Sequence, residues 1–443
     1  MKELTIIGAG PGGYQTALYA ANHDVKVTIY EESDLGGTCL NSGCIPTKTL
    51  LHEASQGATS LDEAMQRKDV VVSQLQAGIE QLLSHPNITL VREHADLSAI
   101  LASRTSGSVI IATGSTPKVL PIEGADEPYV VTSENLLGSS SLSSRIPELR
   151  SPIPADAPTR SLSRSLSSSL VIIGAGVIGM EMACIYSAFG YKVTVVEYLA
   201  ECLPVLDSDI AKRLRKTLEK RGIEFYMQSS VEKIADNVVF FSRKGKQQQV
   251  PADLVLMATG RAPRISGFGL ENTAIEHSPR GIVVDENMQT SVPGVYAIGD
   301  VNARCMLAHA AEYQGRKAVN HMLGIKDTIR LDIMPSAVFT IPEAASVGLS
   351  EDQCKEQNIA HKVLKSFYRS NGKALAMNAT DGMLKLMVST DDDRLLGCHV
   401  YGAHAADIVQ EVSVLMCCNA TLTQLRDMVH IHPTLSEVLS AAL

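Results

Sequence analysis

Two cysteines five residues apart are the residues of this chain best suited to carry chemistry. Cys39 and Cys44 lie in the stretch from Gly36 to Lys48, which reads Gly-Gly-Thr-Cys-Leu-Asn-Ser-Gly-Cys-Ile-Pro-Thr-Lys. If this stretch is helical, the two thiols fall within about one and a half turns, close enough for a strained, reducible disulfide. A thiolate near a helix N-terminus is stabilised by the positive end of the helix dipole, which prepares it for thiol–disulfide exchange.

The same pair could instead form a structural disulfide or half of a zinc site. A zinc site needs a second ligand pair at matching spacing, and the sequence contains none, so we expect no metal. The remaining cysteines are scattered, mostly in apolar surroundings, and we expect them in the core: Cys184, Cys202, Cys305, Cys354, Cys398, Cys417 and Cys418.

The composition limits the class of protein. A chain of 443 residues exceeds one ordinary core, so we expect two to four domains. The net charge of -9 and the lack of a basic tract argue against nucleic-acid binding. No apolar run reaches the roughly 20 residues that span a bilayer. Nine cysteines without a secretion signal indicate a reducing compartment. We therefore expect a cytoplasmic protein, or a mitochondrial matrix protein if the chain is a processed eukaryotic one.

The cysteines must be positioned by the elements around them, and the chain opens in the order strand, glycine turn, helix, strand, acid. Gly8 permits the tight turn, Gly10 lets the backbone approach a pyrophosphate, and Gly13 allows the helix to pack closely on the strand. Glu31 can bind a ribose hydroxyl. The sequence therefore predicts a dinucleotide site, with its elements at residues 4–7, 14–21 and 25–30.

This order returns in the middle of the chain. Gly174, Gly176, Gly179 and Glu197 repeat the motif, and Gly174 to Glu197 spans the same 23 positions as Gly8 to Glu31. An acid at this position favours a free ribose hydroxyl, and no arginine follows it in the loop, so NAD is preferred over NADP. One of the two sites should hold a flavin dinucleotide. The repeated elements are expected at residues 170–173, 180–189 and 192–196.

Other segments are less regular. Residues 47–84 show helical periodicity, residues 97–107 allow no assignment, and the Ser-rich residues 138–169 are typical of a linker or insertion. Two Ala-Thr-Gly turns end at Gly114 and Gly260, and Asp300 ends a strand where it could bind a polyol chain. After Asp332 the pattern predicts an α+β domain with strands at 337–340, 384–388 and 395–400 and helices at 405–418 and 422–429.

A second candidate group lies near the chain end. His432 could act as a base near neutral pH, with Glu437 orienting its imidazole. We expect His430 to point elsewhere.

Together these motifs resemble the flavoprotein disulfide reductases, and within that family the dihydrolipoamide dehydrogenases. The resemblance covers nearly the whole length. It rests on the first glycine motif with Glu31, the cysteine stretch 36–48, both Ala-Thr-Gly turns, the second glycine motif, Tyr-Ala-Ile-Gly-Asp at 296–300 and His-Pro-Thr-Leu-Ser-Glu at 432–437.

The resemblance implies an α/β fold with two Rossmann-type dinucleotide-binding domains and a C-terminal α+β dimerisation domain. The implied boundaries are an FAD-binding and central domain at 1–137 and 258–330, a Ser-rich linker or insertion at 138–169, an NAD-binding domain at 170–257 and a dimerisation domain at 331–443.

The resemblance also implies which residues hold the cofactors, with Glu31 on the adenosine ribose and Asp300 on the ribityl chain. The implied FAD residues are Gly8, Gly10, Gly13, Glu31, Gly37, Thr38, Lys48, Thr113, Gly114, Asp300 and Ala308. The implied NAD residues are Gly174, Gly176, Gly179, Glu197, Gly260 and Arg261.

By the same resemblance, Cys39 is the interchange thiol and Cys44 the charge-transfer thiolate beside the flavin. Lys48 would lie near the reactive flavin nitrogen, paired with Glu181. The enzyme would be a homodimer that oxidises dihydrolipoyl groups with NAD, its electrons passing through the cysteine pair and FAD. Its partner would be a lipoyl-bearing acyltransferase or a glycine-cleavage carrier protein.

In such a homodimer His432 and Glu437 would act in trans, and the bond between His432 and Pro433 could be cis. Glutathione and trypanothione reductases usually carry arginines for NADP after the second strand, and a serine where this chain has Leu435. Mercuric reductases carry a vicinal cysteine pair near the chain end, whereas Cys417 and Cys418 lie in an apolar helical stretch. A catalytically silent flavoprotein that serves as a binding subunit is the remaining alternative.

Overall fold

The computed structural model describes residues 2–58, 60–104, 106–138 and 168–443. The chain forms two compact units. The first comprises residues 1–119, 132–147 and 260–331, and the second comprises residues 120–131, 148–259 and 332–443. Most of the Ser-rich stretch for which the sequence predicts a linker lies outside the described residues.

The first unit is built on a five-stranded parallel sheet in the order β17-β4-β1-β2-β3. Its strands are short runs rich in Val and Ile, and such runs are typical of parallel strands covered on both faces. Ile6, Ile29 and Ile111 are fully buried. The strands are β1 (Glu3–Ile7), β2 (Lys26–Tyr30), β3 (Ile88–Val91), β4 (Ser108–Ile111) and β17 (Val295–Ala297).

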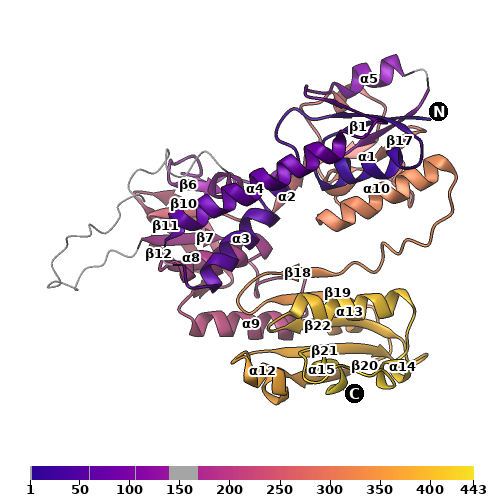
Figure 1. Ribbon diagram of the computed structural model, residues 1–443. Helices are drawn as coiled ribbons and strands as arrows, with labels where there is room; N and C mark the ends of the chain where they lie inside the picture. Colours follow the sequence, from indigo (N-terminus) through magenta and orange to yellow (C-terminus); the bar gives the residue numbers. More distant parts are fainter. Residues whose placement is uncertain (1, 59, 105, 139–167) are drawn as a thin grey trace. The chain divides into compact units, whose positions relative to one another are not determined.

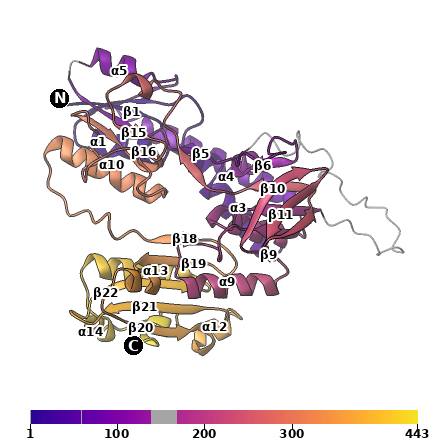
Figure 2. The ribbon, with the colours of Figure 1, turned by 180° about the vertical axis from the view of Figure 1, so that it is seen from behind.

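Helices cover this sheet, and two of them lie side by side, α1 (Pro11–Ala21) and α10 (Ala308–Leu323) (Figures 1 and 2). The long helix α4 (Leu61–Leu83) begins at Ser60, whose side chain accepts a hydrogen bond from the Glu63 backbone N–H. The other elements of the unit are α2 (Gly37–Asn41), α3 (Cys44–Ser55), α5 (Leu97–Ser103), α6 (Ser133–Leu137), the pair β5 (Ser115–Pro117) and β14 (Arg261–Pro263), the pair β15 (His277–Ser278) and β16 (Gly281–Ile282), and the short 3-10 helices Leu270–Asn272 and Gly299–Asn302.

The second unit contains the repeated dinucleotide fold, a five-stranded sheet in the order β6-β13-β7-β8-β9. A three-stranded antiparallel sheet, β10-β11-β12, accompanies it. The elements are β6 (Val130–Thr132), β7 (Ser169–Ile173), α8 (Val177–Ala188), β8 (Lys192–Val196), α9 (Ser208–Lys220), β9 (Glu224–Tyr226), β10 (Ser229–Ala235), β11 (Val238–Arg243), β12 (Lys246–Pro251) and β13 (Leu254–Met257).

The C-terminal part of this unit is an antiparallel sheet in the order β18-β19-β22-β21-β20, with α13 packed on it (Figure 1). Its strands are β18 (Ser336–Val338), β19 (Ala344–Gly348), β20 (His361–Phe367), β21 (Met383–Ser389) and β22 (Leu395–Tyr401). Its helices are α11 (Glu351–Glu356), α12 (Gly372–Ala376), α13 (Ala405–Cys417), α14 (Leu422–Arg426) and α15 (Glu437–Ser440), with a 3-10 turn at Tyr368–Ser370.

The architecture confirms the predicted fold class, and it corrects several details. Residues 97–103 form helix α5, because Asp96 caps it by accepting from the N–H groups of Ser98 and Ala99. Helix α14 ends at Arg426 rather than at residue 429. The sheet β10-β11-β12 and strands β19 and β20 were not predicted. The four-part domain division remains a prediction.

The cysteines also need correction. Cys184, Cys202, Cys354 and Cys398 are buried as predicted, and Cys305 is half-buried. Cys417 and Cys418 are exposed rather than in the core, because they stand at the C-terminal end of α13, where the helix leaves the sheet.

Candidate active site

The two cysteines of the N-terminal stretch lie on two consecutive short helices rather than on one. Cys39 is in the middle of α2, and Cys44 is the first residue of α3, because the backbone breaks at Gly43. A Cβ at Gly43 would come within 2.8 Å of the Thr38 carbonyl oxygen, so this close approach favours glycine. Both cysteines are free thiols. The break places Cys44 at the N-terminus of a 12-residue helix, which favours its thiolate.

The two thiols have different electrostatic environments. The hydrogen bond with Cys44 raises the pKa of Cys39 well above the ordinary range for a thiol, burial raises it further, and the charge of Lys48 opposes the shift. Cys39 therefore keeps its proton throughout the neutral pH range. The roles of interchange thiol for Cys39 and charge-transfer thiolate for Cys44 remain predictions.

The first glycine motif has the geometry of a dinucleotide turn. A Cβ at Gly13 would lie 1.8 Å from the Gly8 carbonyl oxygen, so only glycine fits where α1 crosses β1. The Glu31 carboxylate accepts from the Ala9 backbone N–H at 2.7 Å, and its other oxygen accepts from Ser33. Glu31 thus stabilises the loop itself, in addition to any ribose that it binds.

Asp300 is linked to the cysteine helix by a chain of hydrogen bonds. The Ser115 hydroxyl donates to Asp300 Oδ2, and Arg261 Nε donates to that hydroxyl at 2.7 Å. Arg261 Nη2 also donates to Glu134 at 2.9 Å and to the Thr38 hydroxyl at 3.3 Å. Burial raises the pKa of Asp300, while Ser115 and Arg261 act in the opposite direction.

The remaining residues predicted to bind FAD lie in the same unit. Lys48 is one turn after Cys44 on α3, and Ala308 begins α10. The Thr113 hydroxyl donates to the Arg264 carbonyl oxygen at 3.0 Å, and Gly114 follows with a positive φ of 73°. A Cβ on Gly37 would meet the Gly10 backbone at 2.8 Å, so the cysteine stretch contacts the glycine loop directly.

These residues fit an FAD. Helix α1 starts after Gly10 without a side-chain cap, so its first amides can face a pyrophosphate. Ser115 uses one oxygen of the half-buried Asp300 carboxylate, and the other, Oδ1, accepts from none of the described residues, so it can accept from a ribityl hydroxyl.

The second glycine motif repeats the first in detail. Glu197 accepts from the backbone N–H of Ala175 at 2.5 Å and of Leu199 at 2.7 Å. A Cβ at Gly176 would meet no atom within 4 Å, which leaves room for a ligand beside the turn. Gly179 packs on the Gly174 carbonyl oxygen as Gly13 packs on that of Gly8, and Gly260 has a positive φ of 102°.

Glu181 and Arg261 have contacts that the sequence did not indicate. The buried Glu181 carboxylate accepts from the Phe339 backbone N–H at 2.9 Å. Glu181 belongs to the second unit and Lys48 to the first, so their pairing remains a prediction. The known contacts of Arg261 are all in the first unit, so its role toward NAD also remains a prediction.

The terminal histidine pair has the predicted geometry. His432 Nδ1 lies 2.8 Å from Glu437 Oε1, and the bond between His432 and Pro433 is cis. His430 points elsewhere, as predicted, since it bonds to Glu411 and Ser440.

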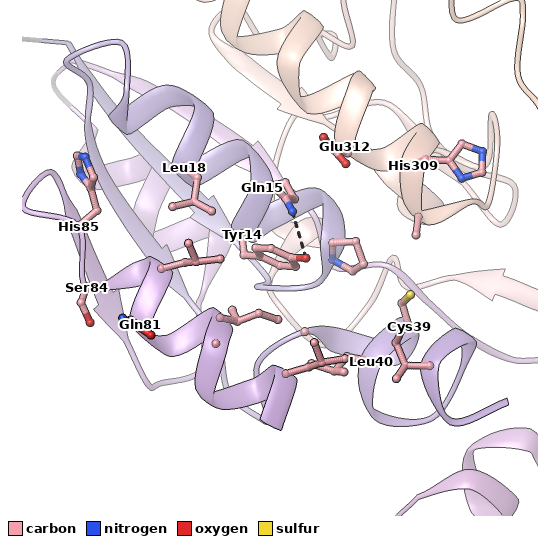
Figure 3. A pocket seen from close by; sticks show the side chains of 18 of the residues that line it. Tyr14, Gln15, Leu18, Cys39, Leu40, Gln81, Ser84, His85, His309 and Glu312 are labelled. Carbon is pink, nitrogen blue, oxygen red and sulfur yellow. Dashed lines mark hydrogen bonds between the residues drawn. The ribbon is translucent and has the colours of Figure 1, made fainter. Parts of the chain in front are cut away.

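A pocket of about 1120 Å³ lies in the first unit and has Cys39 in its wall (Figure 3). Two helix faces line it, each with residues at helical spacing, Tyr14, Gln15 and Leu18 on α1 and Leu75, Gly78, Ile79 and Leu82 on α4. Leu40 and Ile45 add to its apolar surface, and the described residues that line it include no Lys or Arg. The pocket therefore offers the cysteine a largely apolar ligand environment, with Glu312 as an acidic residue in its wall.

Among the described residues, no group of three or more His, Cys, Asp or Glu side chains is arranged to hold a metal ion. Within the same ranges, no helix is both long enough and apolar enough to cross a bilayer.

Two dinucleotide folds, a thiol pair beside the first and an antiparallel C-terminal domain define a dithiol–disulfide oxidoreductase. Residues 2–315 match the model of the pyridine nucleotide-disulphide oxidoreductases, and residues 334–443 match the dimerisation domain of that family. The chain belongs to this family. The family is FAD-dependent and uses NAD or NADP, and its dimerisation domain supports a homodimer.

Individual relatives agree with this assignment. The chain is 34% identical to leghemoglobin reductase of Glycine max, with 100% of this chain and 87% of the relative covered. It is 33% identical to dihydrolipoyl dehydrogenase of Bacillus subtilis, with coverage of 99% and 97%. The flavoprotein disulfide reductase RclA from Escherichia coli, solved as a Cu(II) complex, superposes with a TM-score of 0.84 at 29% identity, covering 99% and 98% of the two chains.

The site also contains four residues that the sequence motifs did not predict: Tyr14, Gln15, Ser115 and Glu134. Tyr14 and Gln15 follow the glycine motif directly, and Ser115 follows an Ala-Thr-Gly turn. Their proximity to motifs was the only available signal. No sequence signal pointed to Glu134, because its contact with Arg261 depends on the position of α6 in the fold.

Proposed function

We propose that this protein oxidises dihydrolipoyl groups to lipoyl disulfides with NAD, through a Cys39–Cys44 disulfide and FAD. The observation that carries the proposal is the position of Cys39 in the wall of a largely apolar pocket. A lipoyl group is an apolar chain that ends in a five-membered disulfide ring, and it suits such a pocket. Glutathione disulfide carries several carboxylates, and the described lining provides Glu312 but no Lys or Arg to pair with them.

The reaction requires two exchange steps at the cysteines. A substrate thiolate attacks the Cys39 sulfur, the bond between Cys39 and Cys44 breaks, and Cys44 leaves as a thiolate at the N-terminus of α3. The second substrate thiolate then attacks the substrate sulfur held by Cys39, so the lipoyl disulfide forms and Cys39 is released. When bound, FAD takes the two electrons from the cysteine pair and passes them as a hydride to NAD.

His432 removes the protons from the substrate thiols in this proposal. Its Nδ1 faces Glu437, which leaves Nε2 as the basic nitrogen. In a homodimer His432 would serve the disulfide of the partner subunit. Lipoyl groups are carried by acyltransferases of 2-oxo acid dehydrogenase complexes and by the glycine-cleavage carrier protein, and we propose one of these as the partner.

The charges around the second glycine motif support NAD over NADP. Glu197 occupies the ribose position, and the first two arginines after it are both ion-paired. Arg213 pairs with Asp209 at 2.9 Å, and Arg215 forms a two-point pair with Glu201 at 2.6 and 2.9 Å. Neither guanidinium is therefore free for a 2′-phosphate.

The test is a set of steady-state assays on the purified flavoprotein. We expect NADH formation from NAD and dihydrolipoamide, with NADP a much poorer acceptor. NADPH-dependent reduction of glutathione disulfide without dihydrolipoamide oxidation would contradict the proposal. A yellow protein that is inactive in both assays would favour the binding-subunit alternative.

A further inference from the structure

Tyr14 stands in the pocket beside the reactive cysteine. It lies on the first turn of α1, half-buried, and Figure 3 shows its ring in the pocket with the hydroxyl directed toward the side of Cys39. Gln15 Nε2 donates to this hydroxyl oxygen at 3.2 Å. Because Gln15 occupies an acceptor position, the hydroxyl proton is free to be donated into the pocket.

The environment keeps this hydroxyl protonated. Burial raises the pKa of Tyr14, and Glu312 and an ionised Cys39 raise it further, against the hydrogen bond from Gln15. The group is therefore a neutral donor throughout the neutral pH range. The polar side chains of Gln81, Ser84 and His85 lie at the other end of the pocket from Cys39 (Figure 3).

Cys39 needs such a donor. In the second exchange step the bond between Cys39 and the substrate breaks, the substrate disulfide forms, and Cys39 leaves as a thiolate that takes its proton from solution. Burial and the neighbouring Cys44 disfavour this thiolate, as the raised pKa of the Cys39 thiol indicates. A poor leaving thiolate slows exchange.

We propose that the Tyr14 hydroxyl donates a hydrogen bond to the Cys39 sulfur as it leaves the mixed disulfide, and that Gln15 orients the hydroxyl for this purpose. The inference rests on the proposed function, because the mixed disulfide is formed with its dithiol substrate. Tyr14 stays protonated and exchanges no electrons. It acts on the release of product rather than on cofactor binding.

The test compares Tyr14→Phe with wild-type holoenzyme in dihydrolipoamide oxidation by NAD. Losing one hydrogen bond to a charged sulfur should lower kcat about tenfold to a hundredfold. Quenched single-turnover samples analysed by mass spectrometry should show the Cys39–substrate mixed disulfide accumulating in Y14F. Oxidation of NADH by ferricyanide, which bypasses the cysteines, should stay at the wild-type rate.

Tyr19→Phe is the matched control, because Tyr19 lies on the same helix but donates to Asn320 at 2.8 Å. Y19F should have the wild-type kcat. The kcat of Gln15→Leu should lie between those of wild type and Y14F. Equal kcat and no mixed disulfide in Y14F would overturn the inference. Wild-type enzyme that is inactive with dihydrolipoamide would instead overturn the proposed function, and Y14F would then be tested with the disulfide that the enzyme does reduce.

Discussion

His432 Nδ1 lies 2.8 Å from Glu437 Oε1, while the other oxygen of Glu437 accepts from the Thr434 backbone N–H at 2.8 Å. The hydrogen bond from the Thr434 N–H is the largest cause that lowers the pKa of Glu437 below its usual range, and the hydrogen bond with His432 is the second. Glu437 is therefore a fixed carboxylate that orients the imidazole, and in the proposed mechanism Nε2 is left for the substrate. The relationship makes Glu437 a positioning residue for His432.

Glu437→Gln should lower kcat/KM for dihydrolipoamide about tenfold, because it removes the charge-assisted hydrogen bond that fixes the His432 ring, and such a bond contributes about 1.5 kcal/mol or more. Glu411→Gln is the control, as it removes the carboxylate 3.0 Å from His430. An effect of E411Q equal to that of E437Q would reject the assignment of His432 as the base.

The electrostatic coupling of the two thiols gives a second prediction. Cys44→Ala removes the hydrogen bond that is the main cause of the raised Cys39 pKa, so this pKa should fall. It should stay above that of a free thiol, because burial remains. The pH dependence of Cys39 alkylation in reduced C44A and wild type measures the difference, and an unchanged profile would show that burial alone sets the pKa.

Arg261 has two candidate roles, support of the FAD site, which its contacts indicate, and NAD binding, which the sequence motif predicts. Its contacts with Ser115, Glu134 and Thr38 predict that Arg261→Gln lowers FAD retention and alters the visible flavin spectrum. The sequence motif predicts a raised KM for NAD instead. Arg264→Gln is the matched control, since Arg264 lies one residue beyond β14 and pairs with Glu32. A raised KM for NAD with full FAD content would favour the sequence-based role.

A buried group outside the active site predicts acid sensitivity. His399 is 1% exposed, and its Nδ1 accepts from the Asp207 backbone N–H at 3.0 Å. Burial lowers the pKa of His399 to about 4. An unfolded histidine titrates near about 6.5, so the unfolded state binds more protons between these values. Stability is therefore complete above about pH 6.5 and declines by about 3 kcal/mol as the pH falls to about 4.

The urea midpoint measured across this range tests the prediction with His399→Asn, whose amide oxygen can replace the Nδ1 acceptor. The wild type should lose stability between pH 6.5 and 4.5 and H399N should not. The nearby Glu351 does not interfere above pH 4.5, because Lys355 and Lys385 lower its pKa from 4.5 to about 2, so its contribution is lost only as the pH falls between these two values. If the urea midpoints of wild type and H399N fell equally with pH, the acid sensitivity could not be assigned to His399.

Much of this molecule could be predicted from the sequence, because its motifs are local. Gly8 to Glu31 and Gly174 to Glu197 each specify a strand, a turn and an acid within 24 residues, and both form as expected. Buried strands such as 254–257 also follow from short apolar runs. Local patterns therefore identified the family and both cofactor folds.

What the sequence left open depends on contacts between distant segments. Lys385 and Asp207 are both buried and form an ion pair at 2.6 Å, although 178 positions separate them. Arg261 meets Glu134 across 127 positions, and the motif around Arg261, which suggested NAD binding, did not predict this contact. The exposure of Cys417 and Cys418 depends on where α13 leaves its sheet, and helical periodicity does not give that end point.

The most direct test of the central claim is differential alkylation of Cys39 and Cys44 in anaerobic holoenzyme, read by mass spectrometry. In the oxidised enzyme both cysteines should resist alkylation as a disulfide. One equivalent of dihydrolipoamide should convert both to thiols, and subsequent NAD should restore the disulfide with formation of NADH. Cysteines that stay unreactive after dihydrolipoamide, or thiols that persist after NAD, would contradict the account.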